Sequence, residues 1–299
     1  MQPSLPRPEA RPTPPARRLR LGQPWAALLG LAGLALPAPA GAVLQGEVSR
    51  DPDGVRAAVV RVENGRGELC SGVLIAPDQV LTAAHCVLEQ TSYRVVGVDR
   101  GFRPRSVLAV AAALHPEFVP GTTPRNQPGV DLAILKTAEP FGPDFLPLDP
   151  RNAGTIGRGQ PVALAGFGVS AERQNKTART LRETRMVSLG TLEVANRVAV
   201  VVDERRLAES MGTGACRGDS GGPVFAGGPG RYQLLGIISW SSGALNVRDR
   251  SACGGLTAVT PVGEHLGWIQ DRSADLARVR VGQVPVAAAG RSNKADWAR

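Results

Sequence analysis

Ser220 stands in the stretch GDSGG, Gly218 to Gly222, where its hydroxyl could serve as a nucleophile. A serine hydroxyl is a weak nucleophile, and it needs a base within hydrogen-bond reach and donors for the oxyanion that attack creates. The glycines around Ser220 let the backbone turn tightly and approach a substrate, so that backbone N–H groups could be those donors. An ordinary glycine–serine turn would have the same composition, so this stretch alone does not decide the function.

A histidine and an aspartate elsewhere in the chain could complete such a site. His85 follows the apolar run VLTAA and precedes Cys86, and Asp131 opens the apolar run DLAILK. An unpaired carboxylate in a buried run would be costly, so we expect Asp131 to have a partner. Taken singly, His85 could also be an ordinary half-buried histidine, and Asp131 a strand-start aspartate.

His85, Asp131 and Ser220, in this order and in these contexts, resemble the catalytic residues of the chymotrypsin/trypsin family of serine proteases. LTAAHC and GDSGGP carry most of the resemblance, while DLAIL, LHPEF, AGFG and SW fall at the expected intervals over nearly the whole chain after residue 42. The resemblance implies that Ser220 attacks the scissile carbonyl, that His85 accepts and returns the proton, and that Asp131 orients the imidazole. It also implies an oxyanion hole made by the N–H groups of Gly218 and Ser220.

The resemblance also implies a pocket for the residue on the acyl side of the scissile bond, called P1. Its floor falls at Gly214 and Ala215, which carry no carboxylate, so cleavage after basic residues is not predicted. We expect small or medium apolar P1 residues, although Ser241 could favour a polar one. The walls are expected from Ser239, Trp240, Ser241 and Gly255.

Asp219 has a predicted role in activation. In the family, the equivalent aspartate pairs with an α-amino group that cleavage releases. The stretch VLQG, beginning at Val43, directly follows the predicted signal-cleavage site and departs from the family pattern by Val43 for Ile and Gln45 for Gly. We therefore expect cleavage after Ala42 to produce an ammonium group at Val43 that pairs with Asp219.

The four cysteines predict two disulfides, because an even number without C-x-x-C spacing in an exported chain usually forms a disulfide framework. The resemblance implies the pairs Cys70–Cys86 and Cys216–Cys253. The three histidines are scattered and offer no recognisable pair of metal ligands, so we expect neither a metal nor a cofactor.

Residues 1–42 have the order of a secretory signal peptide: a positively charged section, an apolar stretch, and the small residues Ala40 to Ala42. The apolar run is shorter than the ~20 residues that span a bilayer, and Pro37 closes it. These features predict a secreted or periplasmic protein with no stable membrane association after cleavage.

The charge pattern does not favour a nucleic-acid or membrane-surface role. Lysine and arginine total 35 against 26 acidic residues, but they form no dense run. Only three of the basic residues are lysines, and this arginine bias, with abundant alanine, glycine and proline, favours a GC-rich genome of the kind common in bacteria.

Short apolar runs broken by Gly, Pro, Asn and Asp predict an all-β sandwich or barrel, with one helix near the end that Pro261 begins. The resemblance implies two six-stranded antiparallel β-barrels, one over residues 43–148 and one over 152–279, and a C-terminal helix. Residues 280–299 are predicted to be a disordered tail. The polar segment 170–185 is predicted to be a surface loop.

The resulting interpretation is a secreted, monomeric serine endopeptidase that acts on polypeptides and has protein inhibitors as further candidate partners. One alternative from another class is a catalytically weak or inactive homologue that acts as a binding module. A second is an α/β-hydrolase, because GDSGG also fits the G-x-S-x-G pattern, with Asp249 and His265 completing the site. The residues GGPV break the helix that such a fold needs after the serine, and LTAAHC would stay unexplained.

Overall fold

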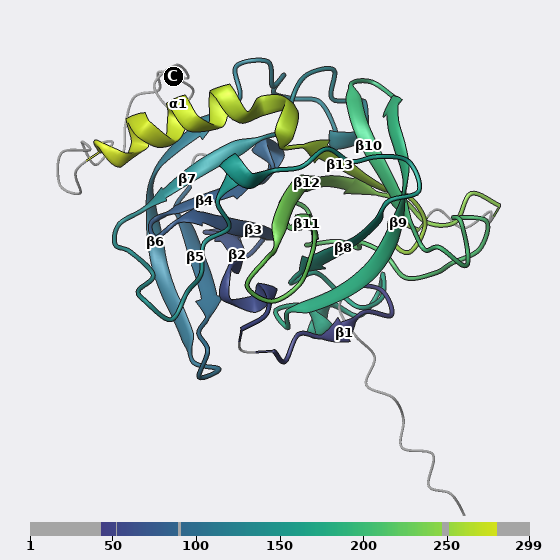
Figure 1. Ribbon diagram of the computed structural model, residues 1–299, viewed down its shortest axis with the longest axis horizontal. Coiled ribbons are helices and arrows are strands. Elements are labelled where there is room, and N and C mark those ends of the chain that lie inside the picture. The colour runs from purple at the N-terminus through teal and green to yellow at the C-terminus, as the bar shows by residue number, and fades with distance from the viewer. Residues whose placement is uncertain (1–42, 52, 89–90, 247–250, 280–299) are drawn as a thin grey trace, which may run out of the picture. The chain divides into compact units, whose positions relative to one another are not determined.

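Short apolar runs form the strands of two closed barrels, and a single α-helix follows them (Figure 1). This arrangement comes from a computed structural model that describes residues 43–51, 53–88, 91–246 and 251–279. The predicted signal peptide and the predicted tail lie outside the described residues. The prediction of two six-stranded antiparallel β-barrels with a C-terminal helix is confirmed.

The first barrel closes in the order β2-β3-β4-β7-β6-β5, and β5 pairs with β2. Its interior is a cluster of buried valine, leucine and phenylalanine side chains that includes Val60, Leu74 and Phe141. The strands are β2 (Val59–Asn64), β3 (Leu69–Ala76), β4 (Gln79–Thr82), β5 (Tyr93–Val98), β6 (Pro104–Leu114) and β7 (Ala133–Thr137).

The second barrel has the order β9-β10-β13-β12-β11-β8 and closes through the pairing of β8 with β9. A short strand, β1 (Glu47–Val48), extends this barrel by pairing with β9. The barrel strands are β8 (Pro161–Gly166), β9 (Arg182–Glu193), β10 (Arg197–Val202), β11 (Pro223–Ala226), β12 (Gln233–Ser241) and β13 (Thr257–Pro261).

The helix α1 (Leu266–Ala277) lies against β6 and β7 of the first barrel (Figure 1). It buries Ile269 and Leu276, and the Gln79 side chain of β4 donates a hydrogen bond of 2.9 Å to the Ser273 carbonyl. Pro261, which was predicted to begin this helix, instead ends β13, because it pairs with Gly236 of β12. None of the described helices is long and apolar enough to cross a membrane.

Six short 3-10 helices connect the strands: η1 (Val55–Ala57), η2 (Ala84–Val87), η3 (Pro124–Asn126), η4 (Pro150–Asn152), η5 (Asn175–Thr177) and η6 (Gly263–His265). The predicted surface loop 170–185 is partly wrong. Its last four residues begin β9, and Ser170, Leu181 and Arg182 are buried. Pairing of Arg182 with Gly166 across β8 and β9 explains why this polar stretch is a strand.

The all-β architecture excludes the α/β-hydrolase alternative. His265, which that interpretation needed, lies beside His115, with 5.1 Å between the two ring centroids, and His115 also contacts the Trp268 ring at 4.9 Å. Burial lowers the pKa of His115 to about 4, with a smaller contribution from His265. Contacts among these rings hold the start of α1 against the end of β6. Asp249, the other residue that the alternative needed, lies outside the described residues.

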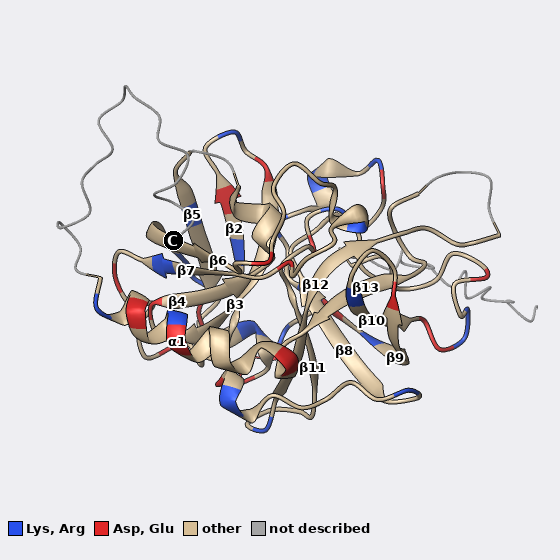
Figure 2. Cartoon of the chain, turned by 90° about the horizontal axis from the view of Figure 1, so that it is seen from above, with Lys and Arg blue, Asp and Glu red and all other residues tan. Residues whose placement is uncertain are grey.

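Charged positions of both signs are interspersed over the described chain (Figure 2). Several of the arginines pair with a neighbouring carboxylate, as Arg103 does with Asp99 and Arg197 with Glu264. Such exposed pairs contribute about 0–1 kcal/mol each to folding, so they have little influence on where the site residues lie.

Candidate active site

Two paired strands of the first barrel bring His85 and Asp131 together. Thr82 of β4 pairs with Ala133 of β7, so His85, three residues after Thr82, faces Asp131, two residues before Ala133. The His85 backbone N–H donates to Asp131 Oδ1 at 3.0 Å, and His85 Nδ1 donates to Oδ2 at 2.8 Å. Two bonds from one residue fix the orientation of the imidazole and leave Nε2 free to accept a proton.

Asp131 is fully buried, with an exposed fraction of 0 %. Its Oδ2 also accepts a hydrogen bond of 2.5 Å from Ser239 Oγ, on β12 of the second barrel. Burial acts to raise the pKa of Asp131, but the neighbouring His85 and the hydrogen bonds from His85 and Ser239 outweigh it and lower the pKa below its ordinary value. Asp131 is therefore an ionised carboxylate that is compensated by donors from both barrels.

Ser220 is linked to this pair through Ser239. Its Oγ donates to the Ser239 carbonyl at 3.3 Å, while the Ser239 hydroxyl bonds Asp131. The sulfur of Cys86 lies 3.7 Å from both His85 Nε2 and the Ser220 carbonyl oxygen. Within the described part of the chain, Ser220 Oγ has its hydrogen bond with Ser239 and not with His85 Nε2.

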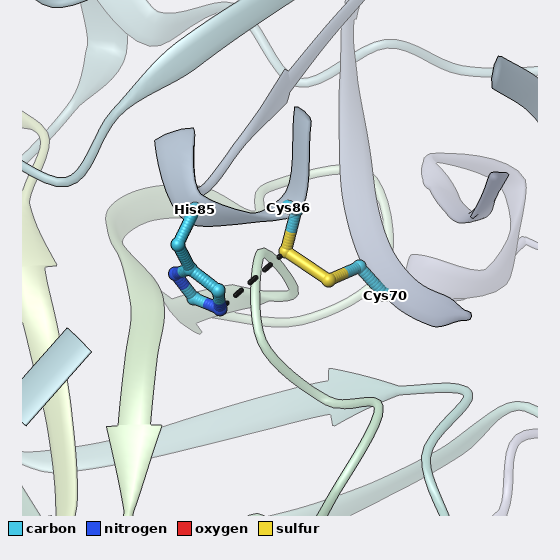
Figure 3. Close-up of side chains that lie close together, drawn as sticks. All are labelled: Cys70, His85 and Cys86. Atoms are coloured by element: carbon cyan, nitrogen blue, oxygen red, sulfur yellow. Dashed lines mark hydrogen bonds between the residues drawn. A yellow bond between two sulfur atoms is a disulfide. The ribbon is translucent and has the colours of Figure 1, made fainter. Parts of the chain in front are cut away.

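His85 lies next to the disulfide of Cys70 and Cys86, whose Cα atoms are 6.1 Å apart (Figure 3). The ligand atoms of these three residues lie within 4.8 Å of one another, which is a spacing that a metal could use. Cysteine binds metals as a thiolate, however, and both sulfurs are used in the disulfide. The disulfide instead joins β3 to η2, the short helix that carries His85.

The backbone around Gly218 has the conformation that its predicted role requires. Gly218 has φ of +94°, and a Cβ at this position would lie 2.9 Å from the Gly168 Cα atom. Any other residue would be strained there. The Gly218 carbonyl accepts a hydrogen bond of 2.9 Å from Ser71 Oγ, which fixes the orientation of this turn.

Ser71 was not recognised from the sequence, yet it connects the first barrel to the nucleophile loop at several points. Its hydroxyl donates to the Gly218 carbonyl and accepts from the Phe167 N–H, both at 2.9 Å. Its own N–H donates to the Ser220 carbonyl at 2.8 Å. Ser71 looks in the sequence like one more residue of an apolar strand, and only the tertiary structure shows its contacts.

Asp219 is a second fully buried carboxylate. It accepts hydrogen bonds from the N–H groups of Gly168, at 2.8 Å, and Cys216, at 2.9 Å. Burial raises the pKa of Asp219 to about 7, although these two bonds and the charge of Arg182 act in the opposite direction. An additional positive charge next to Asp219 would therefore strongly favour its ionised form.

The residues after position 42 lie against the second barrel. Val43 is fully buried in the barrel core, and the N–H of Leu44 donates to the Gly214 carbonyl at 2.9 Å. Gln45 has φ of +58°, in the left-handed region that favours glycine, so glutamine in place of the family's glycine strains this turn. In this uncleaved chain the nitrogen of Val43 is part of a peptide group.

The predicted pocket residues lie on three segments, which are Gly214 with Ala215, the end of β12, and Gly255. Ser239, Trp240 and Ser241 end β12, and a disulfide joins Cys216, next to Ala215, to Cys253. Gly255 approaches Gly243 so closely that a Cβ would lie 2.0 Å from its carbonyl oxygen. Gly255 therefore serves close backbone packing.

Thr257 lies beside the predicted pocket floor and was not identified from the sequence. It pairs directly with Ser241 across β12 and β13, and its Oγ1 accepts a hydrogen bond of 3.2 Å from the Ala215 N–H. A Cβ placed on Gly214 would lie 3.7 Å from the same oxygen. The Thr257 side chain thus lies beside both predicted floor residues. Its position opposite Ser241, an expected wall residue on the neighbouring strand, is the signal that could have identified it.

A family model described as trypsin matches residues 46–269. The chain is 32% identical over 217 residues to human serine protease 56, which covers 65% of this chain and 34% of the relative. It is 27% identical over 235 residues to rabbit vitamin K-dependent protein C, which covers 71% of this chain and 48% of the relative. The chain therefore spans between a third and a half of these relatives.

These relatives are mammalian proteins, and mouse serine protease 56 is a similar match at 31% identity over 212 residues. The comparisons therefore do not support the bacterial origin that the amino-acid composition favoured. Arginine, alanine and proline usage follows base composition, which is not specific to one group of organisms.

Replacing Ser71 by alanine should lower the free energy of unfolding by about 1–3 kcal/mol, because the buried Gly218 carbonyl and Phe167 N–H both lose a partner. Urea denaturation would measure the change. Ser49→Ala is the matched control, since the Ser49 hydroxyl is also buried but has no hydrogen-bond partner among the described residues. Equal effects of the two substitutions would contradict the proposed importance of the Ser71 contacts.

Proposed function

We propose that this chain, which belongs to the trypsin family of serine proteases, is an exported endopeptidase that hydrolyses polypeptides through an acyl-enzyme on Ser220. One observation carries the proposal. Ser220, Ser239, Asp131 and His85 form a continuous series of hydrogen bonds between the two barrels. A nucleophile, a base and a buried carboxylate that orients the base are the three parts that serine-based acyl transfer requires.

In the proposed reaction, the Ser220 hydroxyl turns from the Ser239 carbonyl to His85 Nε2, which takes its proton as the oxygen attacks the substrate carbonyl. Asp131 stabilises the resulting imidazolium. The N–H groups of Gly218 and Ser220 donate to the oxyanion. His85 then protonates the departing amine, and a water molecule, activated by the same imidazole, hydrolyses the acyl-enzyme and restores Ser220.

Cleavage after Ala42 is the proposed activating step. Val43 is buried in the second barrel beside Ala215, which is four residues before Asp219. The Leu44–Gly214 hydrogen bonds hold this segment against the nucleophile loop. An ammonium group at Val43 would supply the positive charge that Asp219, with its pKa of about 7, needs in order to ionise.

The contacts of Thr257 support a preference for small P1 residues. Gly214 and Ala215 leave the floor without a carboxylate, and the Thr257 side chain occupies space beside both of them. An uncharged and partly filled floor disfavours arginine and lysine, because it offers no partner for a buried cation, and it disfavours large aromatic residues for lack of space.

A catalytically weak homologue that acts as a binding module is the second candidate. Two observations favour it: Ser220 Oγ bonds Ser239 and not His85, and Gln45 strains the turn next to Val43. Catalytic hydrogen bonds are often long or misaligned without substrate, so the first observation is also compatible with activity. Polypeptides are the proposed partners in either case, and the enzyme would have protein inhibitors as further partners. In both cases we propose that the chain is monomeric and is secreted or periplasmic.

Ser220→Ala should abolish labelling by a fluorophosphonate, and it should reduce peptide hydrolysis at least ~10⁴-fold. His85→Ala should do the same, because it removes the base. The labelling is measured on protein purified after export, together with its N-terminal sequence, and Ser49→Ala serves as the control. Absence of labelling in the unsubstituted chain would favour the binding module, and a terminus other than Val43 would refute maturation by signal cleavage.

The proposed pairing of Val43 with Asp219 predicts different pH dependence for cleaved and uncleaved chains. A carboxyl whose folded pKa of about 7 exceeds its ordinary 3.8 contributes stability that is complete below pH 3.8 and lost as pH rises through 7. A chain extended before Val43 should therefore lose about 2 kcal/mol between pH 5.5 and 7.5, whereas one that begins at Val43 should not.

The measurement is urea denaturation of both chains at the two pH values, each carrying Ser220→Ala to prevent self-cleavage. Asp219→Asn in the extended chain is the control, since it removes the titrating group and should remove the pH-dependent loss. The same pH dependence in both chains would mean that the Val43 ammonium does not pair with Asp219.

Thr257→Gly should enlarge the P1 pocket and raise the ratio of kcat/KM for phenylalanine over alanine substrates about tenfold or more. Thr260→Gly is the matched control, because it removes the same side chain from the same strand, on the face opposite to Thr257. Peptides that differ only at P1 provide the measurement. An unchanged ratio in a folded Thr257→Gly variant would show that this threonine does not limit the pocket.

A further inference from the structure

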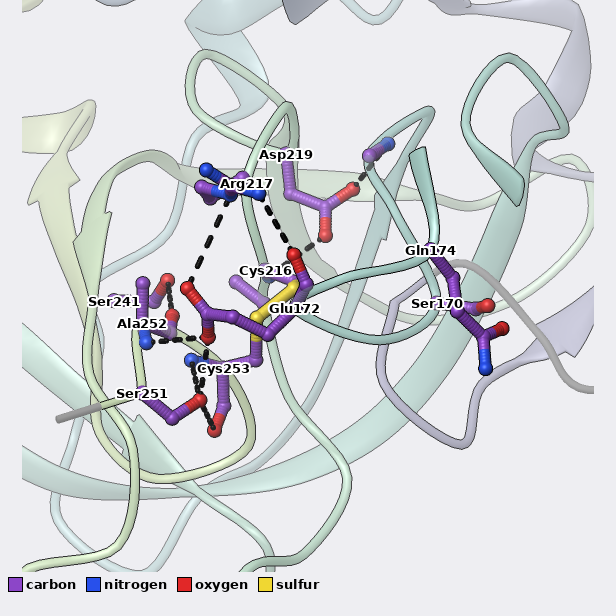
Figure 4. Close-up of a disulfide and its surroundings, with 12 residues drawn as sticks. Ser170, Glu172, Gln174, Cys216, Arg217, Asp219, Ser241, Ser251, Ala252 and Cys253 are labelled. Atoms are coloured by element: carbon purple, nitrogen blue, oxygen red, sulfur yellow. Dashed lines mark hydrogen bonds and ion pairs between the residues drawn. A yellow bond between two sulfur atoms is a disulfide. The ribbon is translucent and has the colours of Figure 1, made fainter. Parts of the chain in front are cut away.

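Glu172 makes an unusual set of contacts from the segment between β8 and β9. Its Oε2 accepts hydrogen bonds from Ser251 Oγ, at 2.6 Å, and from the Ala252 N–H, at 2.7 Å (Figure 4). Its backbone carbonyl accepts a third, of 2.7 Å, from Arg217 Nη2, and the Arg217 Nε atom lies 3.9 Å from Glu172 Oε1. Glu172 thus bonds the segment Ser251–Ala252 and also Arg217, the residue before Gly218. We call Ser251–Ala252 the wall segment, because it leads through Cys253 to the predicted pocket-wall residue Gly255.

The wall segment that Glu172 holds is also bonded to β12. The Ala252 carbonyl accepts from Ser241 Oγ at 2.5 Å, and the Ser251 carbonyl accepts from the Gly243 N–H at 2.6 Å. Cys253, the next residue, is joined to Cys216. Glu172 therefore bonds Ser251 and Ala252 on one side, while the end of β12 and Gly243 bond them on the other. The position of Ser251 and Ala252 would then set the distance between the wall segment and Ser241.

The hydrogen bonds that the Glu172 carboxylate accepts are stronger than hydrogen bonds between neutral groups. A carboxylate that accepts from a hydroxyl and from a backbone N–H forms charge-assisted hydrogen bonds, which are shorter and about twice as strong as neutral ones. The Glu172 side chain is 33% exposed, so water screens the charge only in part. The segment around Glu172 is itself anchored, because the Val169 N–H donates to the Arg217 carbonyl at 2.9 Å and the Gly168 N–H donates to Asp219.

We propose that Glu172 is a specificity-determining positioning residue, whose carboxylate holds the Ser251–Ala252 wall and so sets the size of the P1 side chain that the pocket accepts. This inference rests on the proposed endopeptidase function and extends it. Glu172 does not touch the reacting atoms in this arrangement; it acts through the wall. Removing its carboxylate frees the wall on one side and allows it to move away from Ser241.

The test compares Glu172→Ala and Glu172→Gln with the unsubstituted chain, using peptides that differ only in alanine, leucine or phenylalanine at P1. Glu172→Ala should raise the kcat/KM ratio of phenylalanine over alanine about tenfold. Glu172→Gln, which keeps an accepting oxygen without the charge, should give a smaller rise. Labelling of Ser220 by a fluorophosphonate is measured in parallel and reports whether the nucleophile loop stays intact, because Glu172 also pairs with Arg217.

Glu193→Ala is the matched control, since Glu193 also forms an ion pair with an arginine, Arg197, but on the exposed β9–β10 hairpin. It should leave the P1 ratio unchanged. Amide hydrogen exchange gives a readout independent of cleavage: Glu172→Ala should speed exchange of the Ala252 N–H at least about tenfold, because that group loses its acceptor.

Two outcomes would overturn the proposal, and they can be told apart. If the unsubstituted chain labels and cleaves, but folded Glu172→Ala keeps the same P1 ratio or the same Ala252 exchange rate, the role of Glu172 is wrong and the proposed function stands. If the unsubstituted chain neither labels nor cleaves, the endopeptidase function fails and the inference fails with it.

Discussion

The buried carboxylate of Asp131 is the group on which the rest of the site depends. It comes from the first barrel, yet one of its hydrogen bonds comes from Ser239 of the second. An ionised carboxylate without water is stable only when charge and donors compensate it, and here His85 and Ser239 do so together. The two barrels must therefore meet at this point. Ser220 lies where they meet, because its hydroxyl bonds the same Ser239.

Asp219 shows what a buried carboxylate does without such a partner. Two backbone N–H groups hold it, and its pKa is still raised to about 7, whereas His85 and Ser239 lower the pKa of Asp131. Two equally buried carboxylates thus differ in charge because of their neighbours. In the proposed function, Asp131 is ionised in the folded chain, whereas Asp219 becomes fully ionised only when the Val43 ammonium lies beside it.

The sequence was sufficient to predict the two-barrel fold and the residues that could do chemistry, because each of the latter stands in a short motif. His85 and Asp131 flank strands that pair, so local pattern and tertiary contact agree. Ser71, Thr257 and Glu172 could not be found in this way. Each is a common residue type in an unremarkable stretch, and its contacts are made to segments far away in the chain. The expected loop 170–185 was wrong only in its last part, because residues 182–185 pair with β8 as a strand, and the sequence does not show the partner of that pairing.

The segment from Gly166 to Glu172 connects these features. Asp219 lies against the start of this segment, because a Cβ at Gly166 would lie 2.2 Å from one of its oxygens and the Gly168 N–H donates to its carboxylate. Farther along, the Val169 N–H donates to the Arg217 carbonyl, and Glu172 bonds the wall segment. Asp131 and His85 make no bond to this segment among the described residues. The groups proposed for chemistry and for selectivity are therefore held by different parts of the molecule. Strand pairing in the first barrel brings His85 and Asp131 together, and the segment from Gly166 to Glu172 bonds the loop around Ser220 and the segment Ser251–Ala252. Changes at Glu172 would alter which substrate fits while the arrangement of His85 and Asp131 stays as it is.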